Sequence, residues 1–190
     1  LENTGRTDDD CGTAYRERFL AWMHDFQARD LSVGIAMTDA KGDRSRRPHA
    51  QGNADTYVHI VERTAQGIVI SGTKAIVTGA PYVHELLVMP CRAMTERDSD
   101  FAVCCAVPID ADGLTIVARP AGRPGEKAAL FSARYGQSTG VCVFDRVFVP
   151  CCSAGAWRWW WLGRSCCCRC SCCSAGSGAG AHRRKMRQSQ

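Results

Sequence analysis

The sequence lacks features by which several classes of protein are recognised. It has no run of about 18 apolar residues, so we expect no transmembrane helix and no membrane partner. It begins at Leu1 without a basic segment followed by an apolar one, so no secretory signal is visible. The five cysteines before residue 151 show no disulfide or metal-ligand spacing. They indicate reduced thiols in a cytoplasmic protein.

Acidic residues are absent from residues 151–190, which also contain no Val, Ile, Phe, Tyr, Thr, Asn or Pro. Residues 1–150 hold 17 Lys and Arg against 19 Asp and Glu, a net charge of −2, whereas residues 151–190 hold seven basic residues. The overall charge of +5 therefore comes entirely from that tail. It gives no reason to expect a nucleic-acid partner for the rest of the chain.

Three interpretations of the 151–190 tail remain open. A basic cluster, Arg183–Lys185, could contact nucleic acid or act as an import signal. A thiolate site could bind Zn²⁺ or Cu⁺, although no histidine follows the cysteines at zinc-finger spacing. The abrupt change of composition after Pro150 favours the third, a shifted reading frame or retained non-coding sequence, and we expect an out-of-frame or disordered tail without a metal site. The clustered cysteines are Cys166, Cys167, Cys168, Cys170, Cys172 and Cys173.

Before the tail, hydrophobic spacing predicts one helix followed by short strands. An apolar stripe at helical spacing, with Phe19 and Trp22 at its centre, predicts an amphipathic helix over residues 13–30. Seven short β-rich segments follow, with turns at Ser71-Gly72, Gly79–Pro81 and Asp110–Gly113, and we expect residues 119–136 to be a long loop with one helical turn. These patterns predict a mainly β, antiparallel sandwich or barrel. The predicted strands are 57–63, 67–71, 74–78, 86–89, 101–107, 114–118 and 141–149.

Two polar stretches interrupt this pattern. Residues 36–48, AMTDAKGDRSRRP, hold four cations and two carboxylates, which suits either a solvated loop or a site where backbone amides, a hydroxyl and arginines meet a planar or phosphorylated ligand. Residues 67–80, GIVISGTKAIVTGA, predict a hairpin that turns at Ser71-Gly72 and ends in Thr78-Gly79. A hydroxyl followed by glycine at a strand end allows a ligand to approach the backbone closely.

Together, in this order, the two stretches resemble the flavoprotein family that joins 4-hydroxybutyryl-CoA dehydratase/vinylacetyl-CoA isomerase to 4-hydroxyphenylacetate 3-hydroxylase. The resemblance covers roughly residues 13–150, including VFDRVFVP at 143–150, and MTDAKGDR is similar to the dehydratase branch. It implies an acyl-CoA-dehydrogenase-like fold: residues 1–35 end an N-terminal helical domain and 36–150 form the middle β-domain. A C-terminal four-helix bundle would follow, with FAD between the domains, and the intact protein would form a homotetramer.

The same resemblance implies the site residues. Thr38, Asp39 and Thr78 match positions that lie against the flavin, and Met37 with Lys41–Arg44 (Lys41, Gly42, Asp43, Arg44) matches the part that lines the flavin and acyl-CoA site. A hydroxyl or backbone N–H directed at a flavin nitrogen tunes its reduction. No catalytic residue is assigned. His84, beside Glu85, is interpreted as a structural histidine in a strand.

The activity implied by the resemblance is removal of water from a CoA thioester, with FAD accepting an electron and a proton to leave a thioester-stabilised radical. The dehydratase also holds a [4Fe–4S] cluster, but the body of this chain supplies no four ligands for one. We therefore expect the chain to be a fragment, inactive alone. The alternatives are a reduced-flavin-dependent aromatic hydroxylase, a plain acyl-CoA dehydrogenase and a non-enzymatic, cysteine-rich metal-binding protein.

Overall fold

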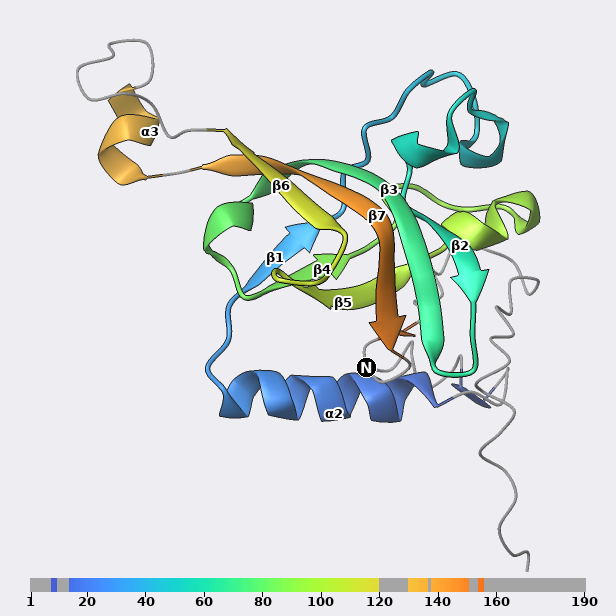
Figure 1. Ribbon diagram of the computed structural model, residues 1–190, viewed down its shortest axis with the longest axis horizontal. Helices are drawn as coiled ribbons and strands as arrows, with labels where there is room; N and C mark the ends of the chain where they lie inside the picture. The colour runs from blue at the N-terminus through green and yellow to red at the C-terminus, as the bar shows by residue number, and fades with distance from the viewer. Residues whose placement is uncertain (1–7, 10–13, 120–129, 137, 151–153, 156–190) are drawn as a thin grey trace, which may run out of the picture.

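Two four-stranded sheets pack face to face in the computed structural model, which describes residues 8–9, 14–119, 130–136, 138–150 and 154–155 (Figure 1). The first sheet has the order β1-β4-β5-β8 and the second β2-β3-β7-β6. The mainly β fold predicted from the sequence is confirmed. The strands of the first sheet are β1 (Val33–Ala36), β4 (Glu85–Val88), β5 (Cys104–Pro108) and β8 (Ala154–Gly155); those of the second are β2 (His59–Arg63), β3 (Gly67–Thr78), β7 (Thr139–Pro150) and β6 (Leu114–Arg119).

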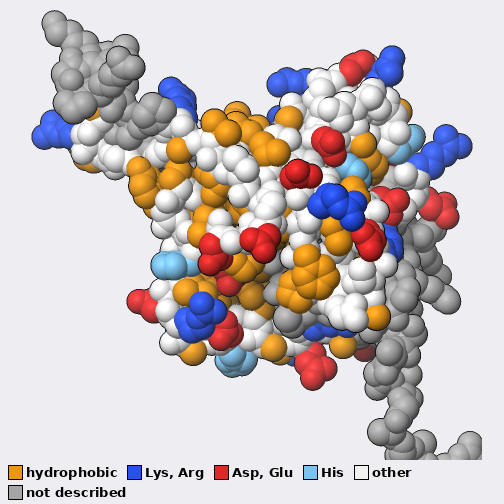
Figure 2. Space-filling model, viewed as in Figure 1, with side chains coloured by type: hydrophobic (Ala, Val, Ile, Leu, Met, Phe, Trp, Pro, Cys, Tyr) orange, Lys and Arg blue, Asp and Glu red, His pale blue; other side chains and the backbone are white. Residues whose placement is uncertain are grey.

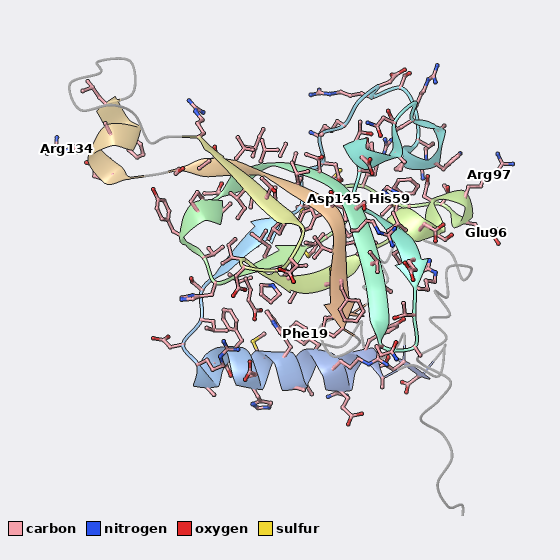
Figure 3. The ribbon with its side chains drawn as sticks, viewed as in Figure 1. Phe19, His59, Glu96, Arg97, Arg134 and Asp145 are labelled. Carbon is pink, nitrogen blue, oxygen red and sulfur yellow. The ribbon has the colours of Figure 1, made fainter. Side chains whose placement is uncertain are left out.

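Helix α2 (Tyr15–Ala28) confirms the helix predicted from the apolar stripe, and it runs along one side of the sandwich (Figure 1). The Asp8 carboxylate accepts hydrogen bonds from the backbone N–H groups of Tyr15 and Arg16 and so caps the first turn. Phe19 projects from α2 toward the strands (Figure 3). Trp22 joins the helix to β4 through Glu85.

The predicted hairpin at Ser71-Gly72 is wrong, because β3 continues through both residues as one strand of 12 residues. Gly72 has a φ of 128°, and a Cβ there would collide with the carbonyl oxygen of Tyr57. The glycine therefore permits a close approach between backbones rather than a turn. The actual turn lies between β2 and β3, where the Thr64 N–H donates to the Gly67 carbonyl at 2.9 Å.

Strand β1 was not predicted from the sequence. It pairs with β4 in parallel, with Ala36 opposite Val88, whereas the other ladders among the described residues are antiparallel. It begins at Val33, so it crosses the expected boundary between residues 35 and 36. Strand β5 starts at Cys104, later than predicted, because Glu96–Phe101 forms the 3₁₀ helix η4.

The core lies between the two sheets. Leu86, Val88 and Val107 of the first sheet pack with Ile70 and Phe144 of the second. The remaining short elements connect strands at the surface: η1 (Pro48–Ala50), η2 (Ala54–Thr56), η3 (Ala80–Tyr82) and α3 (Leu130–Tyr135). Helix α3 lies at the far end of the β6–β7 connection, away from both sheets (Figure 1).

Within the described residues, no helix is long and apolar enough to cross a membrane. The hypotheses made for residues 120–129 and for the tail at 151–153 and 156–190 fall outside the described residues.

Candidate flavin-facing site

The segment that follows β1 runs antiparallel beside β3. The Ala75 N–H donates to the Thr38 carbonyl at 2.8 Å, and the Ala40 N–H donates to the Thr73 carbonyl at 3.3 Å. Asp39 and Lys74 therefore form a pair without hydrogen bonds between their own backbones. In such a pair the two side chains lie close together on the same face.

Side-chain alternation then puts Thr38 on the opposite face, the one directed away from the core. Thr73 and Ala75 share that face with Thr38, and through the β3–β7 register Thr73 lies opposite Val143 and Thr78 opposite Thr139. We call this surface the outer face, and each of its side chains is exposed or half-buried. It comprises Thr38, Ala40, Thr73, Ala75, Thr78, Thr115, Val117, Arg119, Thr139, Val141 and Val143.

The outer face brings together two residues predicted to contact a cofactor, Thr38 and Thr78, which are 40 positions apart in the sequence. Most of its side chains are small (threonine, alanine or valine), and Arg119, which lies opposite Thr139, is the one long side chain among them. In Figure 2, hydrophobic side chains gather over the part of the molecule where β6 and β7 lie. The surface can accept a planar ring with polar atoms at its edges.

A β-bulge interrupts β3 next to Thr78. Lys74 pairs with Cys142 and Val77 with Gly140, so Ala75 and Ile76 together face one residue of β7. Ile76 has a φ of 57°, and the residue is 71% exposed. A β-branched residue in the left-handed region is strained, and such strain is concentrated at functional sites. The strained bulge therefore indicates that the end of the outer face that holds Thr78 belongs to a functional site.

Asp39 lies on the inner side, where its carboxylate is 2.5 Å from the Lys74 ammonium and both side chains are 2% exposed. Lys74 also donates to the carbonyl oxygens of Met37 and Met89. Burial lowers the pKa of Lys74, and the Asp39 charge opposes that effect. The Asp39 side chain thus faces the interior, where its Oδ1 also accepts the Val58 N–H at 3.3 Å, and only its backbone is available to a ligand.

Residues Lys41–Arg44 do not lie on the outer face. They form an exposed turn, together with the 45–56 segment, that projects from one end of the sandwich (Figure 1). Lys41 and Gly42 have φ values of 76° and 44°. The Gln51 side chain holds the turn by donating to the Asp43 carbonyl and accepting from the Asp43 N–H. Hydrogen bonds from Ser45 lower the pKa of Asp43.

The three arginines of this loop differ in their partners. Arg46 pairs with Asp43 at 3.2 Å, and Arg47 pairs with Asp98 at 2.8 Å. Arg44 forms no ion pair with any described residue, so its charge is available to a ligand.

Sequence reasoning missed Asp98, whose side chain is fully buried beneath the loop. Its carboxylate accepts hydrogen bonds from Arg47, from Thr95 and from the His49 N–H, and lies 2.6 Å from His49 Nδ1. Glu96 and Arg97, its neighbours in η4, project away from the sheets (Figure 3). The only signal in the sequence was Thr95-x-x-Asp98, the spacing of a helix capping box.

The described residues contain no group of three or more His, Cys, Asp or Glu side chains that could hold a metal ion. Cys105 and Cys142 are buried, and burial raises their pKa values to about 12 and about 11. His84 bonds to Ser32, with Nδ1 2.9 Å from the hydroxyl. An iron–sulfur cluster therefore does not fit the residues described.

Comparison with known proteins gives a consistent result. The sequence model of the family "4-hydroxyphenylacetate 3-hydroxylase N terminal" matches residues 3–151. The chain belongs to this family. It is 41% identical over 156 residues to the 4-hydroxybutyryl-CoA dehydratase/vinylacetyl-CoA-Delta-isomerase of Clostridium aminobutyricum, covering 79% of this chain and 32% of the relative.

Two solved structures extend the likeness to the fold. An oxygen-tolerant archaeal 4-hydroxybutyryl-CoA dehydratase from N. maritimus aligns with a TM-score of 0.73 and 34% identity, over 81% of this chain and 32% of that one. The oxygenase component of 4-hydroxyphenylacetate 3-monooxygenase, complexed with FAD and 4-hydroxyphenylacetate, aligns with a TM-score of 0.67 and 25% identity, over 80% and 32%. The chain thus spans about a third of the length of these relatives.

Proposed function

We propose that the chain is the middle β-domain of an FAD-dependent enzyme that dehydrates a CoA thioester of the 4-hydroxybutyryl type by a radical route. The observation that favours the dehydratase branch over the hydroxylase branch is the 41% identity to the clostridial dehydratase. The 4-nitrophenol 2-monooxygenase of Rhodococcus sp. is 29% identical. The proposal includes assembly into a cytoplasmic homotetramer.

The residues of the outer face fit a flavin. A tricyclic ring can lie flat on small threonine, alanine and valine side chains, and the hydroxyls of Thr38 and Thr78 are neutral donors for its edge nitrogens and oxygens. When bound, FAD would supply the redox chemistry. The role of the protein is to hold the ring against the outer face, exclude water from that side and set the hydrogen bonds that adjust its reduction.

The exposed turn at Lys41–Arg44 supports a contact with the CoA moiety. Arg44 is exposed and has no carboxylate partner among the described residues, while Lys41 is half-buried at the base of the turn. Arginine binds phosphate oxygens in a bidentate manner, so a CoA phosphate is the ligand that this turn suits. The thioester itself would then extend toward the outer face.

The second candidate is a reduced-flavin-dependent aromatic hydroxylase, favoured by the structural likeness to the monooxygenase that binds FAD and 4-hydroxyphenylacetate. The two can be separated with the complete FAD-loaded protein that carries this chain. Incubation with 4-hydroxybutyryl-CoA, without oxygen, should give a thioester lighter by one water. Hydroxylation of 4-hydroxyphenylacetate with reduced flavin and oxygen, and no loss of water from the thioester, would overturn the dehydratase proposal.

A further inference from the structure

Two segments leave the first sheet side by side. Met37 directly follows β1 and Met89 directly follows β4, whose last residues, Ala36 and Val88, are partners in the parallel ladder. The Met89 N–H donates to the Ala36 carbonyl at 3.1 Å, so the contact continues one residue beyond the strands. The segment after β1 then crosses to β3 and carries Thr38.

One buried ammonium joins both segments to the second sheet. Lys74 Nζ donates to the Met37 carbonyl at 3.0 Å and to the Met89 carbonyl at 2.7 Å, and lies 2.5 Å from Asp39 Oδ1. An ammonium group has three N–H donors, so these three oxygens use all of them. Lys74 therefore fixes the point at which both segments leave the carboxyl ends of β1 and β4.

Stability alone does not account for this arrangement. A buried ion pair is frequently no more stable than apolar residues of the same volume, because both charges lose their hydration. The second carboxylate oxygen of Asp39 is buried without a hydrogen-bond partner among the described residues, so the desolvation of that carboxylate is only partly offset. The pair instead determines which side chains of the segment after β1 face inward. Asp39 is held inward, and its neighbour Thr38 must then face outward.

We infer that Lys74 is a positioning residue for the flavin site: through Asp39 and the Met37 carbonyl it holds the Thr38 hydroxyl on the outer face, and through the Met89 carbonyl it ties the segment after β4 to the same point. This inference rests on the proposed function, in which the outer face receives the flavin. Lys74 itself faces the interior and contacts neither cofactor nor substrate.

The test uses the complete flavoprotein and three variants. Lys74→Met leaves Asp39 as an unpaired buried carboxylate, so both thermal stability and FAD affinity should fall. Asp39→Val/Lys74→Met removes both charges but leaves the Val58 N–H, which donates to Asp39 at 3.3 Å, without its acceptor. Its melting temperature should therefore rise above that of Lys74→Met without reaching wild type, while its FAD affinity stays at least tenfold lower and its flavin potential stays shifted. Val147→Ala changes a buried residue of β7 that is not among the groups bonded to Lys74. It is the control for a loss of stability alone.

Recovery of affinity and potential together with stability in the double variant would overturn the inference, since Lys74 would then serve only the fold. Asp39→Asn/Lys74→Gln is the second variant should the apolar pair not fold. Hydrogen exchange of residues 37–41 and 89–92, measured without added flavin, should be faster in the double variant than in Val147→Ala. Unchanged exchange would also overturn the inference. A wild-type protein that binds no FAD would instead defeat the proposed function, and the exchange result would still decide the role of Lys74.

Discussion

Trp22 donates its indole N–H to a carboxylate oxygen of Glu85 at 2.7 Å, a bond between residues 63 positions apart that joins α2 to β4. The Trp22 ring also packs between Phe19 and Phe26, at centroid distances of 5.7 and 5.2 Å. Trp22→Phe keeps an aromatic ring but removes the donor. We therefore expect the free energy of unfolding, measured with urea, to fall by about 1–2 kcal/mol. Glu85→Gln keeps an acceptor oxygen, so its free energy of unfolding should fall by less. A free energy of unfolding that is the same in Trp22→Phe as in wild type would show that the hydrogen bond contributes nothing.

Gly72 is the position in β3 where a side chain should be least tolerated. Its φ of 128° is unfavourable for other residues, and an added Cβ would collide with the Tyr57 carbonyl. Gly72→Ala should therefore lower the free energy of unfolding by about 3 kcal/mol, from backbone strain and overpacking together. Gly52→Ala is the matched control, because nothing lies within 4 Å of a Cβ there. Equal stability of the two variants would contradict the close approach.

The same glycine shows what the sequence could and could not predict. Ser71-Gly72 resembles a turn locally, and only the position of Tyr57, brought in by long-range pairing, makes it a crossing point. The apolar stripe of α2 and most strands could be predicted, because burial sets their periodicity. The four-residue strand β1 could not be predicted, because a short strand that pairs in parallel carries little periodic signal.

The candidate site was predictable to a similar extent. Thr38 and Thr78 followed from the resemblance, and the structure places them on one face. Lys74 was missed because a lysine in a strand is usually exposed. Lys74 lies an even number of positions after Ile68 and Ile70, which are buried in the same strand. Side-chain alternation therefore indicated that Lys74 faces inward.

Asp98 should make stability depend on acidic pH. Burial raises its pKa, but hydrogen bonds from Thr95, His49 and Arg47 outweigh burial and hold the pKa well below its ordinary value of 3.8. A depressed carboxyl pKa stabilises the fold above the unfolded-state pKa, and this contribution is lost as the pH falls from 3.8 toward the lower folded-state value.

Asp98→Asn should therefore be less stable than wild type at neutral pH, by about 2–4 kcal/mol, because Arg47 loses its buried partner. The difference should shrink as the pH falls below 3.8. Urea unfolding across that range measures it. Asp112→Asn is the control, since Asp112 lies exposed between β5 and β6 and should change stability little. A difference for Asp98→Asn that does not vary with pH would exclude this linkage.

The two threonines of the outer face can be tested separately from the fold. Thr38→Val and Thr78→Val replace a hydroxyl by a methyl group of similar size, so each should weaken FAD binding to the complete protein by about tenfold, equivalent to ~1.4 kcal/mol. Thr64→Val, in the turn between β2 and β3 and outside the outer face, should leave affinity unchanged. Flavin fluorescence titration gives the dissociation constants. Equal, small effects at all three positions would mean that neither Thr38 nor Thr78 donates to the ring.

Ile76 offers a test of whether strain at the bulge serves the site. Asparagine tolerates a φ of 57° better than isoleucine does, so Ile76→Asn should raise the free energy of unfolding of the chain by about 1 kcal/mol. The exposed isoleucine stands beside the strand end that carries Thr78, and its loss should at the same time weaken FAD binding by removing an apolar contact. Val117→Asn, an exposed valine on β6 with ordinary backbone geometry, should show no gain in stability. A gain in stability with unchanged affinity would mean that the bulge stores strain without serving the flavin, and a loss of stability would mean that Ile76 is not strained.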